Sequence, residues 1–315
     1  MITVVGESLV DVIAADGPGP PAAHPGGSAA NVAVALSRLG QPVTLVTQFG
    51  ADDDGDLLRA HLARNGVRVV QAGPVAAASS RAVARLDAAG GASYTFELRW
   101  DVRDLRLASG SSCLHMGSLG VVLAPGGERV RRLAEEVSGR PGVAVSYDPN
   151  IRPSVTPDRA QARAIAERMA GLAHIVKLSD EDLAFLYPGL TPGQLAARWL
   201  GPGAAATRLL VVTRGAGGAL LAARSWCREA APVPVPVTDT VGAGDSFMAA
   251  LLAGLAEAGL LAPEALARGA AAGPDVLHRI AGQAMAAAAL TCTRPGADPP
   301  AAGEMRDFLA ARGLG

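Results

Sequence analysis

Two kinds of hydrophobic pattern alternate along most of the chain. Short apolar runs rich in Val and Leu, such as Val43–Thr47 and Leu209–Thr213, are typical of strands buried on both faces. Between these runs, longer segments repeat an apolar residue every three to four positions, as in Ala29–Leu39, which ends before Gly40. This periodicity predicts helices that bury one side. The alternation favours an α/β fold: a doubly wound, mostly parallel sheet flanked by helices.

The same reading places strands and helices along the whole chain. The expected strands are Ile2–Val5, Val43–Thr47, Val67–Val70, Leu114–Met116, Val143–Tyr147, His174–Lys177, Leu209–Thr213, Leu220–Ala223 and Val233–Val237. The expected helices are Ala29–Leu39, Leu57–Arg64, Gly127–Val137, Asp158–Leu172, Glu181–Tyr187, Gln194–Leu200, Phe247–Leu261, Val276–Leu290 and Glu304–Arg312. The last two strands are expected at an antiparallel edge of the sheet, because prolines interrupt Val233–Val237.

One region departs from this alternation. Arg81–Leu86 and Ser93–Leu98 flank a Gly-rich turn at 88–91, and their side chains alternate between apolar and polar. That pattern predicts an exposed β-hairpin, because core strands of a parallel sheet are apolar throughout. We therefore expect a single domain over residues 1–315, with a small β-sheet lid built from segments near 9–22 and 81–98.

Composition excludes several classes of protein. Half of the 315 residues are hydrophobic, enough for a large core. A net charge of −1 gives no electrostatic reason to expect nucleic acid or an anionic membrane as partner. The three cysteines lie far apart without a C-x-x-C spacing, which argues against a zinc site or disulfides. The chain begins with a strand and has no apolar run of membrane-spanning length, so we expect a cytoplasmic protein.

The stretch from Asp239 to Phe247 concentrates the chemistry of the chain. It reads D-T-V-G-A-G-D-S-F and leads directly into the apolar helix Phe247–Leu261. A glycine turn at a helix N-terminus presents free backbone N–H groups to an anion. A carboxylate such as Asp245 is a poor phosphate ligand, but it suits a general base that takes the proton of an attacking hydroxyl.

This stretch resembles the D-T-x-G-A-G-D-x-F motif of the ribokinase/PfkB-type carbohydrate kinases, and every fixed position matches. A Gly-rich turn explains a bare G-x-G, but it does not explain a match over the whole motif at a strand-to-helix junction. The resemblance implies a ribokinase-like fold and transfer of the γ-phosphoryl group of Mg²⁺-bound ATP to a sugar. It also implies that Asp245 is the catalytic base and that Gly242, Ala243 and Gly244 form the anion hole.

A second run indicates a sugar pocket. Gly26-Gly27-Ser-Ala-Ala-Asn31 resembles the family's N-terminal G-G-x-x-x-N signature. The resemblance implies that Gly26, Gly27 and Asn31, together with the early Asp11, contact sugar hydroxyls; we add Phe96, on the lid hairpin, as a substrate contact. Asn31 alone would be read as a polar residue on a helix face. A pocket built to hydrogen-bond hydroxyls rejects analogues that lack them.

The run Asp148-Pro-Asn-Ile-Arg152-Pro153 closes a predicted strand and resembles a D-P-N-x-R-P run of fructokinase-like members. The resemblance implies that Arg152 reaches the transferring phosphoryl group or the sugar, where a guanidinium offsets developing charge. The alternative is a proline-bounded turn with a surface arginine.

The run Lys177-Leu-Ser179-Asp-Glu181-Asp182 corresponds to the family's phosphate and magnesium region, often N-x-x-E. The matching positions here are Ser179 and Asp182, so this chain departs from the pattern. The resemblance implies that Lys177 and Ser179 lie near ATP and that Asp182 or Glu181 handles Mg²⁺. The three acids also suit a helix N-terminus on purely structural grounds.

Two further loops complete the resemblance, which covers nearly the whole chain. The turn V-T-R-G-A-G-G at 212–218 resembles the family's V-T-x-G-x-x-G and implies ATP contacts at Thr213, Gly215 and Gly218. The segment 290–297 resembles the one that, with the 239–245 loop, supplies carbonyl groups to a monovalent cation. For that K⁺ site the expected residues are Asp239, Val241 and Gly296.

Other functions fit less well. A P-loop kinase needs a lysine in G-x-x-x-x-G-K-[ST], and the single lysine, Lys177, follows Val176. A dinucleotide dehydrogenase is poorly supported, because Gly242-Ala-Gly244 lacks the third glycine. A non-catalytic sugar-binding protein on the same fold stays open, although a binder has no need for Asp245 beside an anion hole.

The acceptor is the remaining choice. We expect fructose, phosphorylated on a primary hydroxyl, because the 148–153 and 177–182 runs are fructokinase-like and aromatic residues for stacking a nucleobase are scarce. A nucleoside kinase and a 2-keto-3-deoxygluconate kinase are the alternatives, the latter because Arg99 and Arg103 beside the lid suit a carboxylate. The expected partners are the sugar and ATP, with no nucleic acid and no membrane, and a homodimer formed through the lid.

Overall fold

The computed structural model describes residues 1–15, 22–75, 78–86, 92–201 and 206–313. Its centre is a nine-stranded sheet in the order β13-β12-β11-β10-β9-β8-β1-β4-β5. In that order the strands are Trp226–Ala230, Ala219–Ala223, Leu209–Thr213, Ile175–Ser179, Ala144–Asp148, Cys113–Gly117, Ile2–Val5, Val43–Thr47 and Arg68–Gln71. All neighbouring pairs from β11 to β5 are parallel, whereas β12 and β13 pair antiparallel at one edge.

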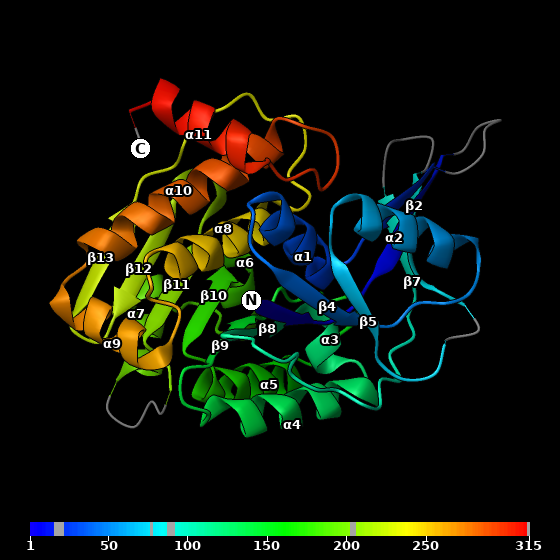
Figure 1. The fold of residues 1–315 in the computed structure, drawn as a ribbon, viewed down its shortest axis with the longest axis horizontal. Coiled ribbons are helices and arrows are strands. Elements are labelled where there is room, and N and C mark those ends of the chain that lie inside the picture. Colours follow the sequence, from blue (N-terminus) through cyan, green and yellow to red (C-terminus); the bar gives the residue numbers. More distant parts are fainter. Residues whose placement is uncertain (16–21, 76–77, 87–91, 202–205, 314–315) are drawn as a thin grey trace.

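Helices cover both faces of this sheet (Figure 1). Successive strand residues point to opposite faces, so Val4 joins the buried cluster on one side and Val5 the cluster on the other. One cluster includes side chains of α1 (Ser28–Arg38), α2 (Asp53–Arg64), α8 (Ala243–Glu257), α9 (Pro263–Ala272), α10 (Asp275–Cys292) and α11 (Ala302–Ala311). The other includes side chains of α3 (Ser118–Val122), α4 (Gly126–Ser138), α5 (Arg159–Leu172), α6 (Asp180–Leu186) and α7 (Pro192–Leu200). The predicted doubly wound α/β fold is confirmed.

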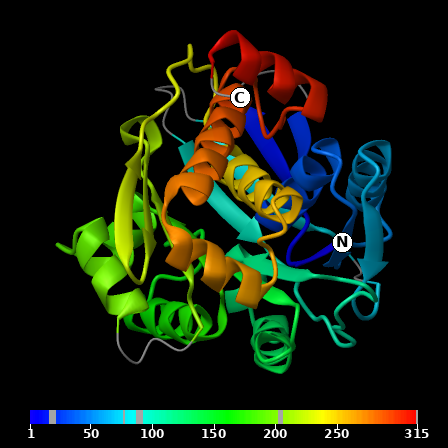
Figure 2. The ribbon, with the colours of Figure 1, turned by 60° about the vertical axis from the view of Figure 1, so that its left-hand side comes forward.

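Helix α8 is deeply buried. Its run from Asp245 to Ala253 is buried, and it packs between α1 and α10, as Figure 2 shows from the side. A helix that is apolar nearly all round needs cover on several sides, and the sheet with two neighbouring helices supplies it. The packing therefore fixes where the N-terminus of α8 lies.

A separate four-stranded sheet forms the lid, in the order β3-β2-β6-β7. These strands are Ala22–Gly26, Leu9–Ala15, Ser80–Leu86 and Ala92–Glu97. Strands β2 and β6 pair in parallel, and β3 and β7 pair antiparallel on the outside. The predicted turn at 88–91, and residues 16–21 of the first lid segment, lie outside the described residues.

Hydrogen bonds fasten the lid to the main sheet where the chain enters and leaves it. The Ser79 hydroxyl donates to the Asp52 carboxylate at 2.6 Å, and the Ser79 N–H donates to it at 2.8 Å. On the way out, the Trp100 indole donates to the carbonyl of Gly120 at 2.8 Å. These bonds attach the lid to the segments that follow β4 and β8.

One predicted element is wrong. Val233–Val237 is not a strand in the structure, and the outer edge strand is β13, Trp226–Ala230, instead. Prolines occupy every second position from Pro232 to Pro236, so this segment lacks the N–H groups that a ladder needs. Within the described ranges, no helix combines the length and apolarity required to cross a bilayer.

Candidate active site

The site lies where the carboxyl ends of the parallel strands meet the N-termini of α1 and α8. The turn before α8 ends at Gly242, whose φ of 76° lies in the left-handed region that glycine tolerates. A Cβ at Gly242 would lie 2.7 Å from the Cβ of Ala297, so the turn is also too close to its neighbour for a side chain. In the first turn, the N–H groups of Gly244 and Asp245 have no intrahelical partners and form an anion-binding end, whereas the N–H of Ala243 donates to the carbonyl of Thr240 at 3.3 Å.

Asp245 lies in this first turn and is 7% exposed. Its Oδ1 accepts a hydrogen bond from the Ser28 hydroxyl at 2.6 Å, and its Oδ2 accepts one from the Asn31 amide at 2.9 Å. Helix α1 thus brings Asn31 against Asp245 although 214 positions separate them in the sequence. The residue predicted to be the base, Asp245, is therefore in direct contact with Asn31, which is predicted to bind the sugar.

Asp11 faces the same space from the lid. It lies opposite His24 on β3, and a Cβ at Gly26 would come within 2.1 Å of its Oδ2, so the neighbouring strand needs a glycine there. Burial raises the pKa of Asp11 to about 6; the charges of His24 and Arg152 oppose this, and that of Asp245 adds to it. His24, Arg152 and Asp245 therefore all lie close enough to act electrostatically on Asp11.

Phe96 lies on the same lid sheet. It pairs with Ala82 on β6, which in turn pairs with Asp11 on β2, so the three residues form one row across the sheet. Phe96 is half-buried and packs against a small cluster that includes Leu9 and Leu119. Its role as a substrate contact stays a prediction.

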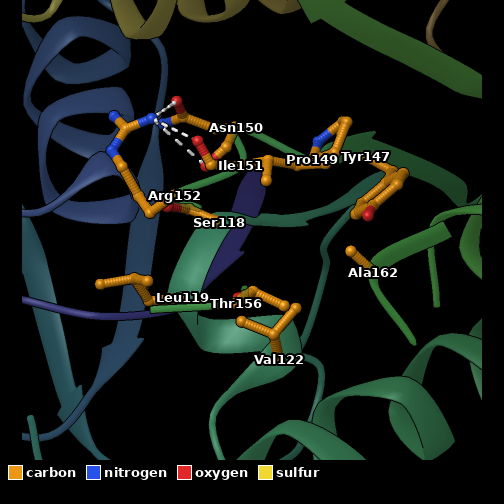
Figure 3. Close-up of a pocket in the computed structure, with 10 residues that line it drawn as sticks. All are labelled: Ser118, Leu119, Val122, Tyr147, Pro149, Asn150, Ile151, Arg152, Thr156 and Ala162. Atoms are coloured by element: carbon orange, nitrogen blue, oxygen red, sulfur yellow. Dashed lines mark hydrogen bonds between the residues drawn. The ribbon is translucent and has the colours of Figure 1, made fainter. Parts of the chain in front are cut away.

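Arg152 is exposed, and Figure 3 shows its guanidinium turned back onto its own turn. It donates to the Asn150 side-chain oxygen at 2.7 Å and to the carbonyl of Ile151 at 3.1 Å. Asn150 has a φ of 37° and Ser118 a φ of 49°, and both residues line the pocket beside Arg152. Such left-handed residues at neighbouring strand ends store strain, a feature that is concentrated at functional sites.

Lys177 lies beneath the turn of the D-T-V-G-A-G-D stretch. Its ammonium donates to Asp148 Oδ2 at 2.8 Å, and both side chains are buried. A Cβ at Gly244 would come within 2.9 Å of Nζ, which places this charge directly under the anion-binding end of α8. Burial lowers the pKa of Lys177, but the charges of the surrounding carboxylates, that of Asp148 first, raise it overall.

Asp182 joins two strand ends. Its Oδ2 accepts the Ser179 N–H at 2.9 Å and its Oδ1 accepts the Ile151 N–H at 2.7 Å, while Ser179 Oγ accepts the Asp182 N–H. This reciprocal capping box begins α6. Glu181, the next acid, is exposed on the surface of α6. Asp182 therefore has a structural role here whether or not it also meets a metal.

The surroundings suit a divalent cation that arrives with phosphate. No group of three or more His, Cys, Asp or Glu side chains in the described part of the chain is arranged to hold a metal alone. Asp148, Asp182 and Asp245 nevertheless all act on the single Lys177, and the buried Oδ1 of Asp148 has no hydrogen-bond partner. Mg²⁺ is commonly held by one or two carboxylates, waters and substrate phosphates, and this set fits that mode.

The predicted ATP turn lies at the same edge of the sheet. Thr213, the last residue of β11, pairs with Ser179 at the end of β10. A short 3-10 turn at Gly215–Gly217 follows, and the chain reverses at Gly218 with a φ of 81°. The structure thus brings Thr213, Gly215 and Gly218 to the end of the sheet that carries Lys177.

The loops predicted to bind a monovalent cation are held together by Asp239. Its Oδ1 accepts the Val241 N–H at 3.0 Å and its Oδ2 accepts the Gly296 N–H at 2.8 Å. The carboxylate is therefore engaged with backbone donors, and any cation here would meet backbone carbonyls. The K⁺ site stays a prediction.

Three residues of this region had no assigned role in the sequence analysis: Glu7, Ser28 and Asp148. Glu7 and Asp148 are charged residues within two positions of the end of a predicted apolar strand, which is a readable sign of a buried polar group at a sheet end. Ser28 carried no such sign, because a serine after two glycines is typical of any helix start.

Comparison with known proteins decides the family. The model for pfkB family carbohydrate kinases matches residues 1–302. The chain belongs to the PfkB family. Among its PfkB relatives, a fructokinase of Klebsiella pneumoniae is 35% identical over 286 residues, covering 87% of this chain and 89% of that protein.

Solved structures agree with this placement. The ATP-bound fructokinase of Xylella fastidiosa superposes with a TM-score of 0.84 at 26% identity and covers 99% of this chain and 98% of its own. A double-mutant fructokinase of Vibrio cholerae O395, in its fructose-, ADP- and potassium-bound form, gives a TM-score of 0.74 at 26% identity, covering 98% and 97%. The ribokinase-like fold expected from the resemblance is confirmed.

Proposed function

We propose that this PfkB-family protein is an ATP-dependent fructokinase that transfers the γ-phosphoryl group to a primary hydroxyl of fructose. The observation that carries the proposal is the Asp245 carboxylate, placed at the N-terminus of α8 and in contact with Asn31. The fructokinase relatives and the fructose-bound neighbour support the choice of sugar.

The chemistry follows from this geometry. Asp245 accepts the proton of the sugar hydroxyl as the oxygen attacks the γ-phosphorus, and the bond to the β-phosphate oxygen breaks to release ADP. The first-turn N–H groups of α8 and the ammonium of Lys177 lie where the transferred group gains charge. Asp11 and Asn31 orient the sugar. The Arg152 side chain, which now bonds to its own turn, can rotate toward either substrate.

The ions belong to the same proposal. When bound, Mg²⁺ neutralises the β/γ-phosphate oxygens, and Asp148 and Asp182 would hold it through waters. A K⁺ ion between the loops at 239–241 and 296 would support the anion hole; the potassium-bound neighbour is consistent with this. We also propose a single-domain protein of the cytoplasm, where ATP is plentiful, that pairs into a homodimer through the lid.

Replacing the base tests the mechanism. Asp245→Asn keeps the shape of the side chain and removes proton acceptance, so turnover is expected to fall by about 10²–10⁴-fold. Fructose affinity, measured by calorimetry, should change little. Asp275→Asn, at an exposed aspartate in the first turn of α10, is the matched control and should retain full turnover. Near wild-type turnover in Asp245→Asn would remove the assignment.

A substrate panel tests the sugar. The kcat/KM for fructose should exceed that for ribose, adenosine and 2-keto-3-deoxygluconate by at least about tenfold, or about 1.4 kcal/mol of transition-state binding. Arg103 is already paired with Asp101 at 3.0 Å, which weakens the case for an acid sugar. If 2-keto-3-deoxygluconate has the highest kcat/KM and Arg99→Ala abolishes that preference, the proposed acceptor is wrong but the proposed kinase activity is not.

A further inference from the structure

A buried carboxylate outside the predicted site joins two helix N-termini. Glu7 follows β1 and is 4% exposed. Its Oε1 accepts the Ser28 N–H of α1 at 3.1 Å, and its Oε2 accepts the Gly120 N–H of α3 at 2.9 Å. Both helices begin at glycines, Gly27 and Gly117, which have no side chain to cap them. Glu7 therefore serves as a shared cap, and its negative charge is favourable at two positive helix ends.

Ser28 continues this connection toward the catalytic carboxylate. Its backbone N–H is held by Glu7, while its hydroxyl donates to Asp245 Oδ1 at 2.6 Å. Helices α1 and α8 pack side by side, so the distance between the two residues is set by the core (Figure 1). The Asp245 carboxylate is thus oriented from α1 at the oxygen that Asn31 does not contact.

The charge of Asp245 also acts on Glu7. Burial raises the pKa of Glu7 to about 7, and the negative charge of Asp245 adds to this effect, while the N–H of Gly120 opposes it. Ser28 lies between these two carboxylates, with its backbone N–H toward Glu7 and its side-chain hydroxyl toward Asp245. Its N–H satisfies one and its hydroxyl satisfies the other.

We propose that Glu7 and Ser28 are positioning residues for the base: Glu7 fixes the first turn of α1, and Ser28 holds Asp245 Oδ1 so that Oδ2 faces the acceptor hydroxyl. The inference rests on the proposed role of Asp245. A carboxylate oxygen has two lone pairs, so Oδ2 can accept from the sugar while Ser28 keeps the plane of the group fixed. Asn31 is then free to turn to the sugar without releasing the base.

Ser28→Ala tests the direct contact. Losing a hydrogen bond to a charged group should lower kcat by about tenfold to a hundredfold, with the KM for fructose within about twofold of the wild type. Ser28→Thr keeps the hydroxyl and should recover most of the loss. Ser37→Ala, at the other end of α1, is the matched control and should leave kcat unchanged.

Glu7→Gln tests the indirect step. The amide cannot accept from both N–H groups, so the first turn of α1 loosens and kcat should fall with little change in KM. Since Glu7 acts through Ser28, the variant carrying both substitutions should lose no more kcat than the worse single variant. Fold is checked by circular dichroism, and Ser28→Ala keeps the proposal testable if Glu7→Gln fails to fold.

The Asp245→Asn background separates the possible failures. If Ser28 acts through the base, adding Ser28→Ala to Asp245→Asn should leave the residual turnover unchanged. An equal fold-loss in both backgrounds, or Ser28→Ala within twofold of the wild type, would overturn the positioning role. A fully active Asp245→Asn variant would instead overturn the proposed function on which it rests.

Discussion

Removing the ammonium of Lys177 should destabilise the protein more than breaking any exposed ion pair would. Lys177 and Asp148 are joined at 2.8 Å, with exposed side-chain fractions of 5% and 1%. Lys177→Met leaves Asp148 buried without its cation, and Oδ1 of that carboxylate already lacks a partner. Breaking a buried pair in this way costs about 3–5 kcal/mol. For a chain of 315 residues the unfolding entropy converts this to a fall in Tm of about 5–8 °C.

The loss should depend on pH with a definite sign. Burial raises the pKa of Asp148 to about 6 even with Lys177 opposing it, and without Lys177 it rises further. A carboxyl whose pKa is raised on folding is tolerated when protonated and costs stability as pH rises toward the folded value. Below about pH 6 the carboxyl of Asp148 is protonated in both folded proteins, so the deficit of Lys177→Met relative to the wild type should be smallest there. It should grow as pH rises above 6, until the higher folded pKa of the variant is passed.

Urea unfolding, followed by circular dichroism at pH 5.5 and pH 8, measures this effect. Arg59→Met, which breaks the exposed pair with Asp56, is the control and should lose about 1 kcal/mol or less. Adding Asp148→Asn to Lys177→Met removes the buried charge and should recover more than half of the loss. A deficit below about 1 kcal/mol, or no recovery in the double variant, would refute the view that the unpaired buried carboxylate causes most of the loss of stability.

Three further predictions follow from the site. The KM for fructose should be constant above pH 7 and should rise as pH falls through about 6, the pKa of Asp11, because the protonated carboxyl no longer accepts hydrogen bonds as an anion. Initial rates measured across pH test this, and Asp11→Asn should abolish the dependence. Gly242→Ala should cut kcat at least about tenfold, because the new Cβ clashes with Ala297 and the φ of this residue is left-handed. The control Gly259→Ala, at the far end of α8, has a φ of 67° but no atom near the new Cβ; it should cost only about 1–2 kcal/mol of stability and leave turnover nearly unchanged. EDTA should abolish turnover, because Mg²⁺ neutralises the phosphates, and replacing K⁺ by a bulky organic cation should lower it; full activity without K⁺ would remove the monovalent site alone.

The sequence alone determined the fold class and the location of the chemistry. Apolar runs and helical repeats are local patterns, and their alternation restricts the chain to a doubly wound sheet. The D-T-V-G-A-G-D-S-F stretch identified Asp245 as a candidate base, since a carboxylate at an anion-binding helix end needs a chemical reason. The predicted strand Val233–Val237 does not form, because its alternate prolines lack the N–H donors that a strand ladder needs, whatever the β-propensity of the valines between them.

Only the tertiary structure decided which groups meet. Nothing local in the sequence indicates that Ser28 donates to Asp245 or that Glu7 caps two helices, because these contacts join segments distant in the chain. Likewise, Lys177 was predicted only to lie near ATP, and the tertiary structure shows that it is also one half of a buried ion pair. Hydrophobic packing places α1 and α8 side by side, and only then do the polar residues at their N-termini come within hydrogen-bond distance. A local pattern determines the element, but the partners of its side chains depend on how the elements pack.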